Sequence, residues 1–244
     1  MRSPLELSGT LYKYRNVIRS LIPKDVSNLV FPAARDMELE FYFSKKYNIT
    51  CSTYDYRVYD FWDSYLSNPS LVFSIAKKLL KSIEFDNYTE ISEIYYSQPD
   101  QNIRSALFLL MNRCGNQIDF FKDSFNLRKA VDAMHFLNNH AHFVPHNVVV
   151  EYANLSDRLG HRSSFTILEL PSMQYKNHIS VVADTSFTEK ELIGYLKNNT
   201  SWCLVTKLTD GVRKYVDDFN FYYLDDRGNR SLSETNKILF FKNN

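Results

Sequence analysis

The hydrophobic and polar positions of the chain follow two spacings, one typical of helices and one typical of short buried strands. Residues 11–22 carry apolar side chains at helical spacing and stop at Pro23. An apolar run at 29–31 predicts a strand, residues 37–46 predict a helix, and residues 49–54 predict a second strand. This order of strand, helix and strand is typical of an open α/β sheet.

The middle of the chain is mostly helical in pattern, and the last third returns to α/β alternation. Helices are expected at 61–66, 71–83 and 102–111, with a polar stretch at about 86–100. Further along, the pattern predicts helices at 127–138 and 189–197, strands at 147–151, 164–168 and 202–206, and a terminal pair of strands at 219–224 and 237–241. We therefore expect an α/β core formed by residues 1–59 and 140–244, with a helical insertion at 60–139.

Composition indicates a globular protein without a strong overall charge. A chain of 244 residues with 44% hydrophobic side chains can bury a sizeable core. Lys and Arg total 29 against 28 Asp and Glu, so the formal charge of +1 gives no whole-molecule attraction to a polyanion. Any binding of nucleic acid would depend on a local basic patch.

The chain shows no targeting or membrane segment. Its first residues lack the apolar stretch of a signal peptide, and no later segment is apolar for long enough to span a bilayer. Cys51, Cys114 and Cys203 are far apart and odd in number, which fits reduced thiols in a cytosol. We expect a soluble intracellular protein of the cytoplasm, or of the host cytoplasm if the chain is viral, with no membrane partner.

Three histidines near the middle of the chain raise the question of a metal site. His140 and His142 have the i, i+2 spacing that places two imidazoles on one face of a strand, and His146 follows. No cysteine or carboxylate cluster nearby completes a ligand set, so we expect no metal.

Residues 106–115 form the most specific motif in the chain. They read Ala-Leu-Phe-Leu-Leu-Met-Asn-Arg-Cys-Gly, and a Phe-Asn pair follows at 125–126. The motif resembles that of the Dam-type (D12 class) DNA adenine N6-methyltransferases, in which an apolar helix ends in Leu-Asn-Arg-x-Gly before a later Phe-Asn pair. A buried helix face with Gly115 as its C-cap explains the apolar spacing, but not Asn112, Arg113 or the Phe-Asn pair. The resemblance implies an α/β fold with a Rossmann-like class I methyltransferase sheet and an inserted helical lobe on the DNA side.

In that family the segment opens a hairpin that contacts DNA, and residues 101–130 of this chain are locally basic. Two acids, Asp119 and Asp123, oppose five basic side chains there: Arg104, Arg113, Lys122, Arg128 and Lys129. The candidate DNA-binding residues are therefore Asn112, Arg113, Lys122, Arg128 and Lys129. An arginine at a helix C-terminus can equally be structural, tying the end of its helix to the core.

A few residues match the positions at which the family binds S-adenosylmethionine. Pro4, Leu5 and Gly9 remain from an N-terminal motif similar to Pro-Leu-Lys-Trp-Ala-Gly-Gly-Lys, and Pro32 remains from Leu-Val-Glu-Pro-Phe-x-Gly-x-Gly. Asp55, after the second strand, stands where the family has an acid that accepts hydrogen bonds from the cofactor ribose. We interpret Gly9, Pro32 and Asp55 as vestiges of a cofactor site.

The rest of the cofactor loop departs from the family. Phe31 replaces the acid, and Arg35 and Met37 replace the two glycines. Glycines let backbone N–H groups approach a ligand, whereas the side chains of Arg35 and Met37 would occupy that space. An ordinary loop with Asp36 as the N-cap of the next helix explains the same residues. Both interpretations predict that no cofactor binds.

The catalytic position departs as well. Residues 165–172, Phe-Thr-Ile-Leu-Glu-Leu-Pro-Ser, align with a strand that runs into the family's Asp-Pro-Pro-Tyr. In the family the acid accepts a hydrogen bond from the target amino group, and the aromatic ring stacks on the flipped base. Glu169, Leu170, Pro171 and Ser172 stand there instead, with a longer acid, no first proline and no ring. A lost stack costs about 1–3 kcal/mol, and a misplaced acceptor costs about a hundredfold in rate. We expect no turnover.

We therefore interpret the chain as a degenerate Dam-like methyltransferase homologue that is not catalytic and acts by binding double-stranded DNA or a protein partner. One alternative is an active DNA adenine methyltransferase with a divergent site, in which Glu169 takes the amino-group role and S-adenosylmethionine is the cofactor. A second alternative is a structural or assembly subunit that reuses the fold. Fold analogy alone does not choose among them.

Overall fold

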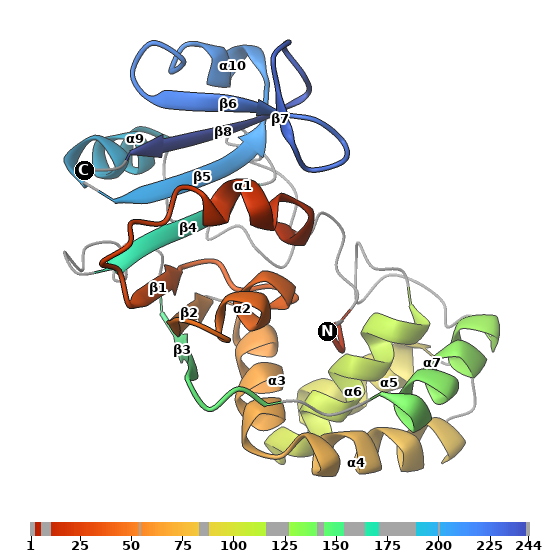
Figure 1. Ribbon diagram of the computed structural model, residues 1–244. Helices are drawn as coiled ribbons and strands as arrows, with labels where there is room; N and C mark the ends of the chain where they lie inside the picture. Colours follow the sequence, from red (N-terminus) through yellow and green to blue (C-terminus); the bar gives the residue numbers. More distant parts are fainter. Residues whose placement is uncertain are drawn as a thin grey trace. The chain divides into compact units, whose positions relative to one another are not determined.

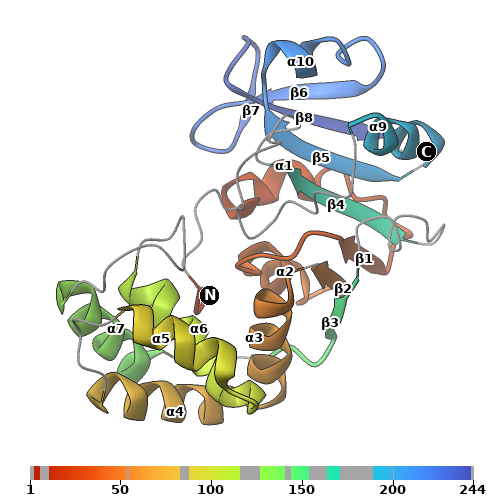
Figure 2. The same cartoon turned by 180° about the vertical axis from the view of Figure 1, so that it is seen from behind.

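A computed structural model describes most of the chain, which forms two compact units. The described residues are 3–5, 11–53, 55–82, 88–115, 127–140, 144–153, 164–170, 189–199 and 201–242. Unit 1 comprises Met1, Gly9–Tyr54 and Asn147–Asn244, and unit 2 comprises Arg2–Ser8 and Asp55–His146. The helical insertion expected at 60–139 falls inside unit 2. Figures 1 and 2 draw the two units from opposite sides.

Unit 1 is built on an eight-stranded, mostly parallel sheet with the strand order β3-β2-β1-β4-β5-β8-β6-β7 (Figure 1). The strands are β1 (Asn28–Phe31), β2 (Asn48–Thr53), β3 (Val148–Tyr152), β4 (Ser164–Leu170), β5 (Trp202–Lys207), β6 (Asn220–Leu224), β7 (Arg230–Ser231) and β8 (Lys237–Lys242). The first five strands in this order, β3, β2, β1, β4 and β5, run parallel to one another. Strand β8 is antiparallel to both β5 and β6. The expected α/β class and the terminal antiparallel pair are confirmed, and the arrangement is compatible with a Rossmann-like fold.

The central strands are buried because their sequences are apolar almost without interruption. In β5, Trp202 to Val205 are all buried, and in β4 the buried run extends from Ser164 to Leu168. Strands covered on both faces have this composition, since neither face meets water. The edge strand β3 instead exposes Val149 and Tyr152.

Helices cover both faces of the sheet in unit 1. The 3-10 helix η1 (Leu11–Tyr14) and α1 (Arg15–Arg19) lie on one face, and α9 (Glu189–Asn198) lies on the other (Figures 1 and 2). The apolar side of α9 packs on Trp202, whose indole N–H donates to the carbonyl oxygen of Leu196 (2.9 Å). Two further short helices, α2 (Glu38–Phe43) and α10 (Asp210–Arg213), complete the described helices of this unit.

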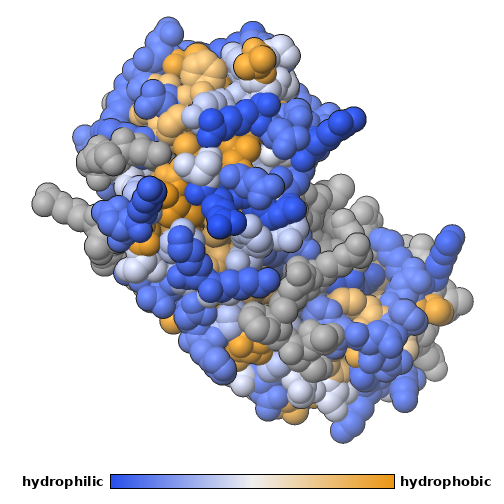
Figure 3. Space-filling model, in the orientation of Figure 1, coloured by the Kyte–Doolittle hydropathy of each residue, from blue (hydrophilic) through white to orange (hydrophobic). Residues whose placement is uncertain are grey.

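Unit 2 is helical, and its central helix is α6 (Gln101–Cys114), which contacts the four others. Those four are α3 (Tyr56–Ser67), α4 (Pro69–Ser82), α5 (Tyr88–Ser97) and α7 (Leu127–Asn139). Every residue of α6 from Ser105 to Asn112 is buried, because helices surround it on several sides. Trp62, Tyr65, Phe73 and Phe108 are among the largest fully buried side chains, and on the face drawn in Figure 3 the described surface is mostly hydrophilic.

Two differences from the expected elements have simple causes. The helix expected at 11–22 is a 3-10 turn followed by a short α-helix that ends at Arg19. The polar stretch at about 86–100 contains α5. Its Thr, Glu and Ser residues interrupt the apolar pattern in the sequence, so the buried face formed by Ile91 and Tyr95 was not predicted. None of the helices within the described ranges has the length and the apolar character needed to cross a bilayer.

Candidate functional site

The candidate site of unit 1 lies where the loop after β1 meets the end of β4. These strands are neighbours in the sheet, but β1 leads to β2 on one side and β4 leads toward β5 on the other. Ligands of open α/β sheets bind at such a topological switch point, outside the carboxyl ends of the strands. The last register pair is Val30 with Thr166, so Glu169 lies three residues beyond it, beside the loop that follows β1.

A pair of opposite charges spans this point. The guanidinium Nη1 of Arg35 lies 3.9 Å from Oε2 of Glu169, and the two side chains are only 15% and 10% exposed. Arg35 was expected at a glycine position of the cofactor loop, and Glu169 at the acid position of the catalytic tetrapeptide. The structure therefore brings the two together, with each side chain directed toward the other.

Met37 has the backbone conformation that glycine adopts most easily. Its φ is 55° and its ψ is 21°, in the left-handed region, and it is the one non-glycine residue with positive φ among those the structure describes. Its side chain is fully buried, with 0% exposed. Met37 is the N-cap residue of α2, so the prediction that Asp36 holds this position is wrong. Asp36 lies one residue earlier, and its Oδ1 accepts a hydrogen bond from the Glu38 N–H (3.2 Å).

Three carboxyl groups are concentrated around this loop, and burial raises the pKa of each. Burial, followed by the charge of the Asp36 carboxylate, raises the pKa of Glu40 to about 8. Burial also raises the pKa of Asp36 to about 6 and that of Glu169 to about 7, although Arg35 acts in the opposite direction on Glu169. Near neutral pH, Glu40 is therefore protonated and Glu169 is part-ionised.

Further groups act on the same cluster from neighbouring elements. Lys237 at the start of β8 and Lys13 in η1 both lower the pKa of Glu169, and Glu169 contributes to the raised pKa of Tyr14 after burial. Burial, followed by the Glu40 charge, raises the pKa of the Cys51 thiol in β2. The switch point thus holds a mixed set of charges contributed by the strands β4 and β8, the helical segments η1 and α2, and the loop after β1.

Other residues expected at the cofactor and catalytic positions are placed only in part. Pro32 is buried in the turn after β1. The backbone of Leu170 pairs with Thr206 at the end of β4. Gly9, Pro171 and Ser172 lie outside the described residues.

Asp55 belongs to unit 2, where it caps a helix. It is the N-cap of α3, and its Oδ1 accepts hydrogen bonds from the backbone N–H of Arg57 (2.9 Å) and from Arg57 Nε (2.8 Å). Its Oδ2 accepts a third from Arg57 Nη2 (2.6 Å). These bonds fit the cap role that a lone aspartate commonly has at the start of a helix.

The residues of the Asn-Arg-Cys-Gly motif have structural contacts inside unit 2. Asn112 is buried. Arg113 donates from Nε to the carbonyl oxygen of Pro4 (2.7 Å) and from Nη2 to that of Ser3 (3.1 Å), and its guanidinium lies 3.6 Å from the centre of the Phe136 ring. Arg113 therefore fixes the N-terminal residues 3–5 to the end of α6.

The other basic side chains of segment 101–130 differ in exposure. Lys129 donates from Nζ to the carbonyl oxygen of Gly115 (2.5 Å), so the C-cap residue of α6 has a hydrogen-bond donor for its carbonyl group. Arg104 forms an ion pair with Asp60 (2.6 Å). Arg128 is exposed on α7, and Lys122 lies outside the described residues.

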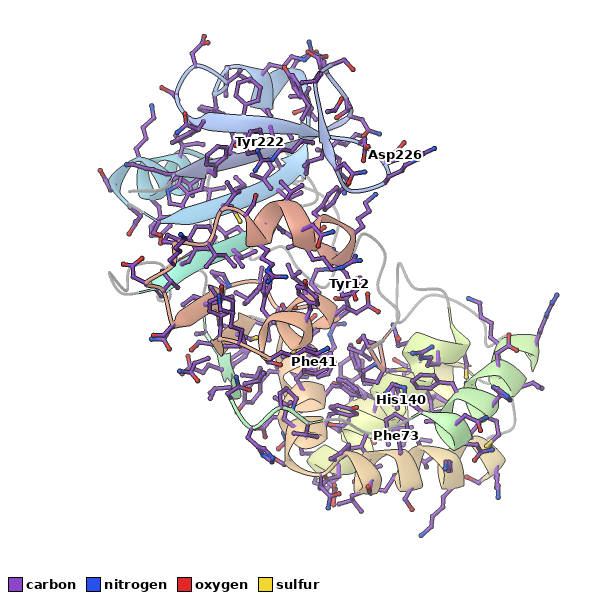
Figure 4. The ribbon with its side chains drawn as sticks, in the orientation of Figure 1. Tyr12, Phe41, Phe73, His140, Tyr222 and Asp226 are labelled. Atoms are coloured by element: carbon purple, nitrogen blue, oxygen red, sulfur yellow. The ribbon has the colours of Figure 1, made fainter. Side chains whose placement is uncertain are left out.

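His140 packs against aromatic rings, as Figure 4 shows for Phe73. Its ring centre lies 5.5 Å from that of Phe73 and 4.5 Å from that of Phe136. His142 is outside the described residues, and His146 is exposed. Within the described part of the chain, no three His, Cys, Asp or Glu side chains are grouped so that they could hold a metal ion.

Glu40 is the residue of the site that sequence reasoning missed. It is 6% exposed and follows Leu39 and precedes Phe41, both of them buried. A glutamate flanked on both sides by apolar residues in a short helix indicates burial. Consecutive residues point to different faces of a helix, so burial of both neighbours leaves little of the helix exposed to water.

Comparison with known proteins adds no relative. No protein-family model and no curated protein matches the chain.

We predict that glycine at position 37 is tolerated better than alanine. Met37→Ala should reduce the free energy of unfolding by about 2–5 kcal/mol, because the buried side chain is lost. Met37→Gly loses the same side chain but fits positive φ, so it should be about 1 kcal/mol more stable than Met37→Ala. Urea denaturation of both variants measures the difference. A glycine variant less stable than the alanine variant would contradict the left-handed conformation.

We predict that stability falls as pH rises from about 5 to about 8. Glu40 has a folded-state pKa of about 8 against an ordinary value of 4.5, so the folded state holds a proton that the unfolded state releases. The contribution of Glu40 is fully present below its unfolded pKa and is lost as pH rises through its folded pKa. Glu40→Gln, which resembles the protonated acid, should flatten this dependence and raise stability at pH 8 by at least about 2 kcal/mol.

The matched control for Glu40→Gln is Glu234→Gln, which removes a surface carboxylate paired with Arg213. This control should leave the slope of stability against pH unchanged over the same range, since surface ion pairs contribute little. Equal slopes for Glu40→Gln and the wild-type protein would show that Glu40 is ionised in the folded state.

Proposed function

We propose that the chain is a degenerate methyltransferase of the class I fold that binds no S-adenosylmethionine, transfers no methyl group and acts by binding a macromolecular partner. The observation that carries this proposal is the arrangement of three side chains at the switch point. Arg35 and Glu169 approach each other there, and the side chain of Met37 is buried in a glycine-like backbone conformation.

Sheet order and loop conformation support the resemblance to the Dam-type family. Parallel strands followed by an antiparallel pair are the usual form of a methyltransferase core, and the sheet of unit 1 has this form. Met37 has positive φ at a position where the resemblance implies glycine. A loop that keeps this turn while carrying a long side chain is what loss of a cofactor site predicts.

The residues at the catalytic position support the absence of turnover. Glu169 is turned toward Arg35 rather than held in a rigid Pro-Pro turn, and burial keeps its pKa near 7. An acceptor for an amino group must be fixed in orientation to contribute to rate. The active alternative would require Glu169 to leave this contact.

For the partner, the contacts of unit 2 favour a protein over duplex DNA. Arg104, Arg113 and Lys129 each donate to acceptors within unit 2, and Asn112 is buried. Side chains with these roles contribute less to phosphate binding than exposed ones, because engaging a phosphate would cost them their internal bonds. Arg128 is exposed on α7, so it is the described side chain of segment 101–130 at which the DNA alternative is tested.

We predict that S-adenosylmethionine produces no saturable heat in calorimetric titration of the folded protein, because Arg35 and Met37 stand where the family has the glycines of the loop around its methionine end. Binding in the micromolar range would contradict the proposal. Labelled methyl groups should likewise not be transferred to unmethylated genomic DNA. Methyl transfer that Glu169→Gln abolishes, in a variant shown to be folded by circular dichroism, would establish the active alternative.

We predict that Arg128→Ala leaves the salt dependence of duplex binding unchanged. Each phosphate contact contributes about 0.9 to the slope of log K against log salt, so an arginine that binds phosphate reveals itself in that slope. Fluorescence anisotropy of a labelled duplex at several salt concentrations measures it. A slope reduced by about one in Arg128→Ala, with Lys207→Ala on β5 of unit 1 as the unaffected control, would make DNA the partner.

A further inference from the structure

Unit 2 contains a pocket of about 220 Å³ that the proposed function does not use. It lies between α3, the end of α5 and α6, and its lining residues are Tyr56, Asp60, Tyr95, Tyr96, Gln98 and Arg104. Pockets for cofactors and drug-sized ligands measure roughly 300–1,000 Å³. The pocket therefore suits a small head group or a single side chain.

Three tyrosine rings dominate the lining. Tyr56 is 43% exposed and Tyr96 is 58% exposed, so both rings are accessible, whereas Tyr95 is 1% exposed. The rings of Tyr95 and Tyr96 are nearly perpendicular, with an interplanar angle of 84° and centres 5.4 Å apart. Rings at this angle turn their faces in different directions, and the face of an aromatic ring attracts a cation within about 6 Å of its centre.

The arginine of the pocket is already occupied. Arg104 donates from Nε (2.9 Å) and Nη2 (2.6 Å) to Oδ2 of Asp60, and from Nη1 to the carbonyl oxygens of Gln98 (3.1 Å) and Pro99 (2.9 Å). Four of its five N–H groups are thus used. An anion entering the pocket would find few donors on this side chain.

The aspartate of the pocket retains an acceptor. Both bonds from Arg104 end on Oδ2 of Asp60, and Oδ1 accepts no hydrogen bond from the residues that the structure describes. Asp55 and Asp63 lie on the same helix and interact with Arg57 and Gln101, respectively. Along α3 and its N-cap, three carboxylates (Asp55, Asp60 and Asp63) therefore stand against two guanidinium groups (Arg57 and Arg104), a balance of one negative charge.

The tyrosine hydroxyls respond to this negative field. Burial raises the pKa of Tyr56, and Tyr96, Asp55 and Asp60 raise it further, against the opposite effect of Arg57. Burial likewise raises the pKa of Tyr95, with Tyr56 and Asp60 adding to it. Burial acts against any charge, but the Asp55 and Asp60 carboxylates act against a phenolate and in favour of a cation.

We propose that this pocket binds an alkylated ammonium ion, with the accessible rings of Tyr56 and Tyr96 against its alkyl groups, the buried Tyr95 at its base and Oδ1 of Asp60 toward its charge. Methylated ammonium groups suit such a site because they carry a full charge, form few or no hydrogen bonds and offer apolar surface to aromatic rings. The site lies wholly within unit 2, so it is independent of the proposed loss of the cofactor site in unit 1.

The test compares choline with 3,3-dimethylbutan-1-ol, which has the same shape without the charge. Titrations followed by aromatic NMR shifts should show saturable binding of choline and at least tenfold weaker binding of the alcohol. Tyr96→Ala and Tyr56→Ala should each weaken choline binding about two- to fivefold, since an exposed cation–π contact has that value. Tyr152→Ala, which removes an exposed tyrosine from β3 of unit 1, is the matched control and should change nothing.

A second titration distinguishes the two sources of such a cation. Acetylated trimethyllysine amide represents a modified side chain, and choline represents a free metabolite, so the tighter ligand identifies the source. Equal binding of choline and the neutral alcohol would overturn the proposal. Inorganic phosphate that binds in place of both cations, or an equal effect of Tyr152→Ala, would overturn it too.

Discussion

Burial of carboxyl groups at the switch point is the constraint on which the architecture of unit 1 depends. Asp36, Glu40 and Glu169 are withdrawn from water, and a buried carboxyl group is costly unless its ionised form is paired with a cation or the group stays protonated. Glu169 has Arg35 beside it, and Glu40 holds its proton. The loop after β1 must stay close to β4, because opening it would separate Arg35 from Glu169.

Met37 shows how the backbone conformation of this loop can be retained when a residue with a side chain replaces glycine. A left-handed residue with a side chain is disfavoured by roughly 1–2 kcal/mol. Burial of a methionine side chain contributes about 1.5–3 kcal/mol, which offsets that cost. The backbone turn therefore survives without glycine, provided that the side chain finds an interior position, and Met37 is fully buried.

Sequence patterns predicted most of the fold and less of the site. Apolar runs predicted β1, β4 and β5 because buried parallel strands are apolar on both faces. The helix α5 was missed because polar and exposed positions separate its buried residues, Ile91 and Tyr95. Arg35 and Glu169 are far apart in the sequence, and only the pairing of β1 with β4 in the sheet brings them together. The role of Arg113 depends on carbonyl groups about 110 residues earlier, which no local pattern encodes.

The division of the chain between the units has a consequence for its synthesis. Residues of unit 1 stand on both sides of Asp55–His146, and β1 lies between β2 and β4 in the sheet. Domains tend to fold as they leave the ribosome, N-terminal parts first. The helices of unit 2 are complete once His146 has emerged, but β1 and β2 must wait for β4. The strands that are translated first, β1 and β2, are therefore among the last to reach their place in the sheet. Until then, their apolar edges are the ones that a chaperone would have to shield.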